Sequence, residues 1–174
     1  MKLINLFALV CILSITSCKQ EQNRIPSEEK ITSTYYFIRH AEKDRSDSLN
    51  NDPHLTEKGL ERAKKWSEVL KNVSFDAVYS TDYNRTRETA LPTATNNNLD
   101  LILYNPRTIE IDSFINTTKG KNVLVVGHSN TTPGFVNTIL KTNTYEDIDD
   151  ANNANLYIVT IINNQITSSL LFID

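Results

Sequence analysis

The sequence predicts an α/β fold, a three-layer αβα sandwich with a mainly parallel sheet and an antiparallel strand in a C-terminal hairpin. Over most of the chain, short apolar segments rich in β-branched and aromatic residues alternate with segments of helical periodicity. Near the C-terminus, two alternating segments, 155–162 and 165–172, flank Asn163-Asn164, a pair typical of a two-residue hairpin turn. The chain has 174 residues, a length that suits one domain with a full core.

The first strand is predicted at 35–38, where four bulky β-formers run into Arg39 and His40. Residues 44–53 are almost all polar and predict a loop. A helix is expected to begin after Thr56, a good N-cap residue. Its spacing predicts one apolar face against the sheet, made of Leu60, Ala63, Trp66 or Ser67, and Leu70.

The middle of the chain continues the alternation. A strand is predicted at 75–80, a helix at 85–95 and a third strand at 99–103. Pro92 is expected to kink the helix or end it early. A short helix is predicted at 110–117.

The last parallel strand is predicted at 122–127, which is β-branched and apolar through its middle. Thr131 or Thr132 is expected to cap the helix that follows. The acidic stretch 147–150 lacks the glycine and the spacing of a calcium loop, and it is expected to be a solvated loop.

Residues 1–17 are expected to be a signal peptide outside the fold. Lys2 supplies a positive start, and the largely apolar run 3–15 is too short for an ordinary membrane-spanning helix. Residues 15–18 resemble the lipobox of bacterial lipoproteins. The alternative is an ordinary signal peptide, with Cys18 not acylated.

The lipobox resemblance implies that Cys18 is acylated and becomes the first mature residue. The protein would then be an exported lipoprotein of a bacterial cell envelope, facing the periplasm or at the cell surface, and its partner through Cys18 would be the membrane. Residues 18–33 would form the lipidated cysteine and a polar tether, and 34–174 the domain. Since Cys11 lies in the removed segment, no disulfide is expected.

Composition excludes several classes of partner. The net charge is −3 with both signs interspersed, so no basic face for nucleic acid is expected. No glycine-rich phosphate loop or nucleotide fingerprint occurs among the four glycines, and no cofactor is expected. The three histidines are distant from one another and have no carboxylate at ligand spacing, so no metal site is predicted.

Polar side chains follow three of the predicted strands. Arg39 and His40 follow the first, Arg85 follows the second and His128 follows the fourth. Because parallel strands place their carboxyl ends at one edge of the sheet, these four side chains are expected to form a pocket for a tetrahedral dianion. A helix start at Thr131 would add backbone N–H donors.

Three segments resemble signatures of the histidine phosphatase (phosphoglycerate mutase-like) superfamily. Residues 39–43, RHAEK, resemble its Arg-His-Gly motif; residues 80–90 are similar to its second motif, and 125–129 to its last. Their order and spacing fit, and the resemblance extends over nearly all of 34–174. Departures are Ala41 in place of the usual Gly, Glu88 where Gln is commoner, and Ser129-Asn130 in place of a Gly-rich pair.

The resemblance implies a role for each matching residue. His40 would be the nucleophile that forms a phosphohistidine, and Arg39, Arg85 and His128 would bind the phosphoryl oxygens. In one branch of the family a basic residue occupies the place of Lys43, which would extend the cationic pocket toward the substrate. Arg45 is a weaker candidate of the same kind. The alternative for both residues is a solvated charge on a loop.

The proton donor is less defined. Residues 105–110 resemble the segment in which many family members carry the acid, so Glu110 is the first candidate, with Glu42 and Asp82 in reserve. Glu110 could equally be an ordinary first-turn glutamate. His54 is expected either to line the crevice or to be a surface residue before the helix cap.

The function implied by the resemblance is a cofactor-independent phosphatase, a phosphoric monoester hydrolase acting on a phosphorylated small molecule. The alternatives are a protein phosphohistidine phosphatase and a non-catalytic, membrane-tethered anion-binding module.

Overall fold

The computed structural model describes residues 30–174. The predicted signal peptide and Cys18 lie outside these residues. The elements are β1 (Thr32–Arg39), α1 (Glu57–Val69), β2 (Ala77–Thr81), α2 (Asn84–Asn96), β3 (Leu101–Tyr104), α3 (Ile111–Thr117), β4 (Asn122–Gly127), α4 (Thr131–Leu140), β5 (Asn155–Ile162) and β6 (Gln165–Phe172).

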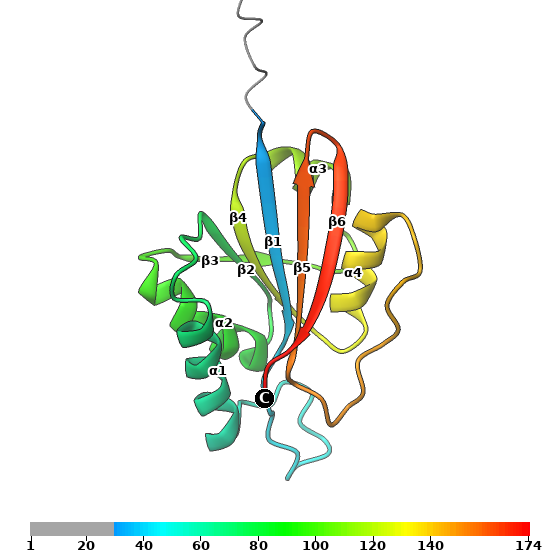
Figure 1. Ribbon diagram of the computed structural model, residues 1–174. Coiled ribbons are helices and arrows are strands. Elements are labelled where there is room, and N and C mark those ends of the chain that lie inside the picture. The colour runs from blue at the N-terminus through cyan, green and yellow to red at the C-terminus, as the bar shows by residue number, and fades with distance from the viewer. Residues whose placement is uncertain (1–29) are drawn as a thin grey trace, which may run out of the picture.

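The strands form one six-stranded sheet in the order β3-β2-β4-β1-β5-β6 (Figure 1). β1 lies in the middle, parallel to β4 and antiparallel to β5. The β2 strand pairs in parallel with both β3 and β4, whereas β6 pairs antiparallel with β5. The predicted fold class is confirmed, and both strands of the C-terminal hairpin are antiparallel to their neighbours.

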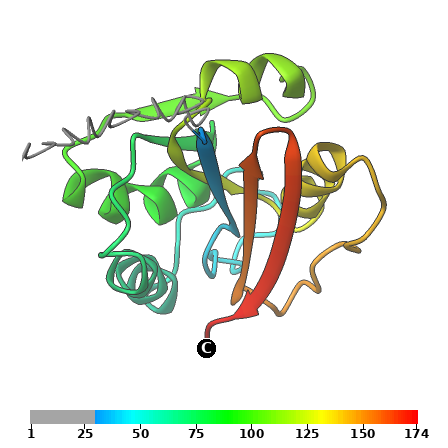
Figure 2. The ribbon, with the colours of Figure 1, turned by 45° about the horizontal axis from the view of Figure 1, so that its top comes forward.

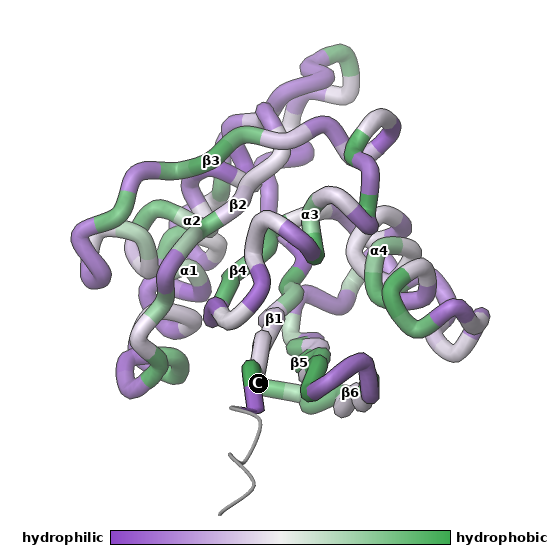
Figure 3. The backbone as a smooth tube through the Cα atoms, turned by 90° about the horizontal axis from the view of Figure 1, so that it is seen from above, coloured by the Kyte–Doolittle hydropathy of each residue, from purple (hydrophilic) through white to green (hydrophobic). Residues whose placement is uncertain are grey.

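Alternating side chains of the central strands build two cores, one on each face of the sheet. Tyr35 and Phe37 of β1 point to the face covered by α3 and α4, where they pack with Phe114 and Phe135. Ile38 points to the opposite face, covered by α1 and α2. Figures 2 and 3 show the two helix pairs on opposite sides of the sheet.

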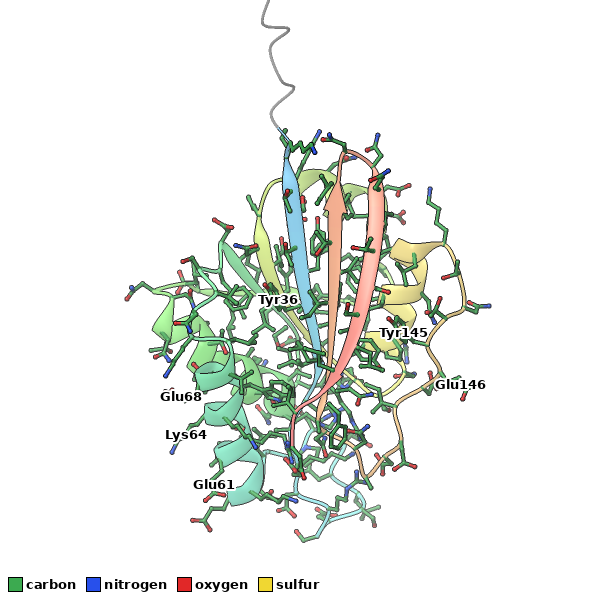
Figure 4. The ribbon with its side chains drawn as sticks, in the orientation of Figure 1. Tyr36, Glu61, Lys64, Glu68, Tyr145 and Glu146 are labelled. Atoms are coloured by element: carbon green, nitrogen blue, oxygen red, sulfur yellow. The ribbon has the colours of Figure 1, made fainter. Side chains whose placement is uncertain are left out.

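The α1 helix confirms Thr56 as N-cap, since its hydroxyl accepts a hydrogen bond from the Gly59 N–H. The predicted place of Leu60 in its buried face was wrong. Leu60 is 46% exposed, and Gly59 is buried in its place against the backbone of Glu42. The charged residues Glu61, Lys64 and Glu68 point away from the sheet (Figure 4).

Pro92 does not end α2, which continues to Asn96. Thr89, Ala90, Thr93 and Ala94 on either side of it are buried, and this packing maintains the helix although proline removes a backbone donor.

The cap of α4 is Asn130 rather than Thr131 or Thr132. Its side-chain oxygen accepts from the Thr131 N–H at 2.9 Å.

β1 begins at Thr32, inside the segment predicted to be tether, because residues 32 and 33 pair with the end of β5. The β3 strand is shorter than predicted and begins at Leu101. At the hairpin, Asn163 and Asn164 have φ values of 48° and 69°, as a type I′ turn requires. Within 30–174, no helix is long and apolar enough to cross a membrane.

Candidate active site

The parallel strands β1, β2 and β4 end together at the lower edge of the sheet in Figure 1, opposite the start of β1. Arg39 is level with Gly127, and the His40 N–H donates to the Gly127 carbonyl at 2.9 Å. A cavity of about 800 Å³ opens there. Its lining includes all four residues predicted for the dianion pocket, Arg39, His40, Arg85 and His128.

His40 is 4% exposed, and its contacts define its tautomer. Its Nδ1 lies 2.8 Å from the carbonyl oxygen of Ala41. Because a carbonyl only accepts, Nδ1 carries the proton and Nε2 keeps its lone pair. The backbone is braced on both sides: the Asn153 amide donates to the His40 carbonyl at 2.7 Å, and the Ala41 N–H donates to the Thr89 hydroxyl at 2.9 Å.

Both cavity histidines are neutral near pH 7. Burial lowers the pKa of His40 to about 3, with a smaller contribution from the positive charge of Arg39. Burial and the charge of Arg85 lower the pKa of His128 to about 4. A neutral imidazole is the form that can attack phosphorus.

His128 lies edge-on to His40, with 5.5 Å between the ring centroids. Its Nε2 is 3.0 Å from the Thr81 hydroxyl, which in turn donates to Thr86 at 2.9 Å. Thr81 therefore accepts from His128, and Nδ1 is the ring nitrogen left for a ligand. Tyr83 packs on His128 from another side, at 5.1 Å between centroids.

The Arg85 guanidinium stacks over the ring of Tyr83 at 4.3 Å, and its side chain is 11% exposed. Asp52 is 3.7 Å from its Nη1, and the Asn51 carbonyl accepts from Nη1 at 3.4 Å. Its Nε is buried and has no partner within the part of the chain that the structure describes. Arg85 thus retains donors for an anion in the cavity.

Arg39 is almost fully buried, and residues 149–152 hold one end of its guanidinium. Its Nη1 donates to the carbonyls of Asp149, Asp150 and Asn152 at 2.8, 3.1 and 2.9 Å, and Nη2 donates to the Asp150 carboxylate at 2.7 Å. The Nε atom is buried and has no partner among residues 30–174.

Lys43 also lines the cavity, and partial burial, followed by the charges of Arg85 and Arg45, lowers its pKa. Arg45 is not part of the lining and pairs with Asp150 at 2.8 Å. The structure therefore brings Lys43 together with the predicted site and places Arg45 at its margin.

The carboxylates separate into two groups. Glu110 lines a different cavity of about 640 Å³, next to α3, α4 and the hairpin, so the structure does not bring it together with His40. Glu42 is held by Arg62 at 2.9 Å and lies outside the cavity lining. Asp82, paired with Arg87, and Asp150 are the carboxylates in the lining.

His54 is a surface residue before the helix cap, which was one of the two alternatives predicted for it. Its side chain is 68% exposed, pairs with Glu88 and does not line the cavity. The other carboxylate oxygen of Glu88 accepts from the Leu55 N–H at 2.8 Å. Glu88 thus holds the loop that precedes α1.

Thr81 and Tyr83 also line the cavity and were not singled out from the sequence, whereas Arg107 and Asp150 come from segments 104–110 and 142–153, which were expected to line the crevice. Thr81 and Tyr83 lie within the second motif, which was the available signal for them. Asp150 is exposed in a loop, as expected, but only the tertiary structure brings its carboxylate to Arg39. With both histidines neutral, four basic and two acidic lining side chains leave a net charge of about +2.

No group of three or more His, Cys, Asp or Glu side chains that could hold a metal ion occurs among residues 30–174. The donors at this site are arginine and lysine cations and two histidines. They suit an oxyanion, since guanidinium groups bind phosphate oxygens in pairs.

Several solved structures are similar to this chain in fold. A phosphoserine phosphatase from Entamoeba histolytica, in complex with phosphoserine, is 15% identical with a TM-score of 0.61, covering 79% of this chain and 96% of its own. The protein histidine phosphatase SixA complexed with tungstate is 15% identical with a TM-score of 0.63, covering 80% and 96%.

A phosphoglycerate mutase from Bacillus anthracis is 17% identical with a TM-score of 0.65, covering 82% and 93%. No curated protein sequence matches. The sequence model of the histidine phosphatase superfamily (branch 1) matches residues 35–113, which include Arg39, His40 and Arg85. The chain therefore resembles the histidine phosphatase superfamily in the sequence of residues 35–113, and it is similar in fold to the structures named above.

Proposed function

We propose that this protein is a cofactor-independent phosphatase that hydrolyses a phosphomonoester through a phosphohistidine on Nε2 of His40. The observation that carries the proposal is a buried, neutral His40 whose Nδ1 proton is held by Ala41 and whose Nε2 is unprotonated. Arg39, Arg85 and His128 line the same cavity. The superfamily supports phosphatase chemistry in general, and the small-molecule substrate is part of the proposal.

In the first step the phosphoryl group binds among Arg39, Arg85 and His128. The unpartnered Nε–H groups of the two arginines donate to its oxygens. The dianion favours the protonated form of His128, because opposite charges attract, so Nδ1 becomes a further donor. These donors stabilise the charge on the oxygens in the transition state.

The lone pair of His40 Nε2 then attacks phosphorus, the N–P bond forms and the bond from phosphorus to the ester oxygen breaks. The leaving oxygen takes a proton from an acid. Water next attacks the phosphohistidine, its proton passes to the same group, and orthophosphate leaves with His40 neutral again.

We propose Asp82, which lines the cavity and pairs with Arg87 rather than with Arg39, as the acid. Of the two carboxylates in the lining, Asp150 is held ionised, since hydrogen bonds from Arg45 and Arg39 lower its pKa to about 2. Glu110 remains a prediction that its position in a separate cavity does not support.

The test is turnover of an aryl phosphate by the domain from about residue 25 onward, with a chelator present, for the wild type and His40→Ala. We expect activity that survives chelation and falls by more than about 10³-fold in the variant. Enzyme quenched in alkaline denaturant should carry phosphate on His40 that is stable to base and is released by acid. Equal activity in both proteins would overturn the assignment of His40.

A second candidate is a phosphatase acting on phosphohistidine in proteins. The likeness to SixA over 96% of that chain favours it. Release of phosphate from a phosphohistidine-bearing protein faster than from small phosphomonoesters would favour this candidate over the first.

We further propose that the chain is an exported lipoprotein acylated on Cys18. The support is the sequence of residues 1–18. In Figure 1, β1 begins at the end of the sheet opposite the carboxyl ends of β1, β2 and β4, so a tether would join the domain on the side away from the site. Incorporation of labelled palmitate into the wild type, and its loss in Cys18→Ser, would test acylation.

A further inference from the structure

The carboxylate of Asp150 lies between two arginines at the cavity. One oxygen accepts from Nη2 of Arg39 at 2.7 Å, and the other lies 2.8 Å from Nη1 of Arg45. The Asp150 side chain is 69% exposed, whereas that of Arg39 is only 3% exposed. A surface carboxylate thus binds the end of a buried guanidinium that lines the cavity.

The backbone of the same loop completes the contact. Three carbonyls between residues 149 and 152 accept from Nη1 of Arg39, so Asp150 and its neighbours occupy the Nη1 and Nη2 end. The buried Nε is left without a partner in residues 30–174. Because a guanidinium is planar with its N–H groups in fixed directions, holding one end sets the direction of the Nε edge.

Asp150 places a negative charge in a cavity that is expected to bind a dianion. A carboxylate in the lining repels a phosphate dianion, so by charge alone it would weaken substrate binding. The carboxylate is nevertheless bonded to an arginine of the predicted dianion pocket. Alignment of Arg39 by Asp150 would strengthen binding of the phosphoryl group, whereas the negative charge of Asp150 would weaken it. Variants that remove one effect and keep the other can separate the two.

We propose that Asp150 is a positioning residue, which orients the Arg39 guanidinium so that its Nε edge faces the phosphoryl group. Its second contact, with Arg45, ties the loop after β1 to the loop before β5. The inference rests on the proposed function in that Arg39 is taken to bind the phosphoryl group.

The test compares Asp150→Ala, Asp150→Asn and Asp147→Ala with the wild type. The asparagine amide oxygen can still accept from Arg39 but carries no charge, whereas alanine removes both the contact and the charge. Asp147 is an exposed acid of the same loop outside the cavity lining, so its variant is the matched control. Turnover of an aryl phosphate and calorimetric binding of orthophosphate are measured for each protein.

We expect Asp150→Ala to lower kcat about tenfold, the effect of losing one charged hydrogen bond that aligns a transition-state donor. Asp150→Asn should keep kcat within about threefold and bind orthophosphate more tightly than the wild type, because the repulsive charge is gone. Asp147→Ala should change neither quantity. Equal kcat values in the alanine and asparagine variants would overturn the proposal, since Asp150 would then act through charge or not at all.

Failure of the proposed function gives a different result. If the wild type turns over no phosphomonoester, orthophosphate binding still decides: weaker binding in Asp150→Ala than in Asp150→Asn supports the positioning role, and equal or absent binding overturns it. Melting temperatures verify folding. If the alanine variant does not fold, Asp150→Ser, whose side chain is too short to reach Arg39, takes its place.

Discussion

The hydroxyl of Thr81 connects His128 to α2. It accepts from Nε2 of His128 at 3.0 Å and donates to the Thr86 hydroxyl at 2.9 Å, so the last residue of β2 holds the ring of a residue just after β4. This contact assigns the proton of His128 to Nε2 and leaves Nδ1 for the ligand.

Thr81→Val keeps the shape of the side chain and removes that contact. We expect kcat to fall about tenfold, because an unpartnered Nε2–H no longer holds the His128 ring, a loss of about 1–2 kcal/mol. Thr81→Ser, which keeps the hydroxyl, is the control and should retain most activity. Unchanged kinetics in Thr81→Val would show that packing against Tyr83 alone orients the ring.

The three histidines of the chain should titrate very differently. Contact with Glu88 raises the pKa of His54, whereas burial lowers those of His40 and His128 to about 3 and about 4. In an NMR titration of the histidine rings from pH 8 to pH 5, one residue should protonate and two should stay neutral. His54→Gln should remove the titrating signal. A His40 signal that titrates near pH 6.5 would contradict the neutral nucleophile.

The same pKa shifts make stability depend on pH. Below pH 6.5 His40 is protonated in the unfolded chain but stays neutral in the folded protein. The free energy of unfolding therefore falls as the pH falls toward about 3. Each such group contributes a slope of up to about 1.4 kcal/mol per pH unit. Urea denaturation between pH 6.5 and pH 4.5 should show a smaller fall in His40→Asn than in the wild type. An equal fall in the free energy of unfolding of both proteins would exclude His40 as a source of the pH dependence.

Two glycines in helices should respond oppositely to alanine. A Cβ at Gly59 would collide with the backbone carbonyl of Glu42, so Gly59→Ala should destabilise the protein by about 2 kcal/mol or more. A Cβ at Gly134 in α4 meets nothing within 4 Å, so Gly134→Ala should stabilise it by up to about 1 kcal/mol. Chemical denaturation measures both. Similar stabilities for the two variants would contradict the close approach of α1 to Glu42.

The identity of the proton donor can be tested through the leaving group. A nitrophenolate leaves without protonation, whereas an alkoxide needs a proton. Asp82→Asn should therefore slow hydrolysis of an alkyl phosphate by about 10²-fold or more and affect a nitrophenyl ester much less. Glu110→Gln should leave both rates within about twofold of the wild type, because Glu110 lines a separate cavity. A large, leaving-group-dependent effect of Glu110→Gln would return the role to that residue.

Much of the fold could be predicted because the signals are local. The bounds of β4, β5 and β6 follow from runs of apolar and alternating residues, and the type I′ turn follows from two asparagines that tolerate positive φ. Leu60 was mispredicted because the backbone of Glu42 approaches α1 at Gly59, and Pro92 does not end α2 early because the residues around it are buried. The cap of α4 was also mispredicted, since Asn130 rather than a threonine accepts from the Thr131 N–H.

The sequence by itself determined the α/β class and the order of its strands and helices. It also placed Arg39, His40, Arg85 and His128 after parallel strands, whose carboxyl ends must meet. Only the tertiary structure decided which carboxylates reach that edge. Loops 44–53 and 141–154 have no period that fixes their course, so the contact of Asp150 with Arg39 and the separation of Glu110 from His40 arise from long-range packing.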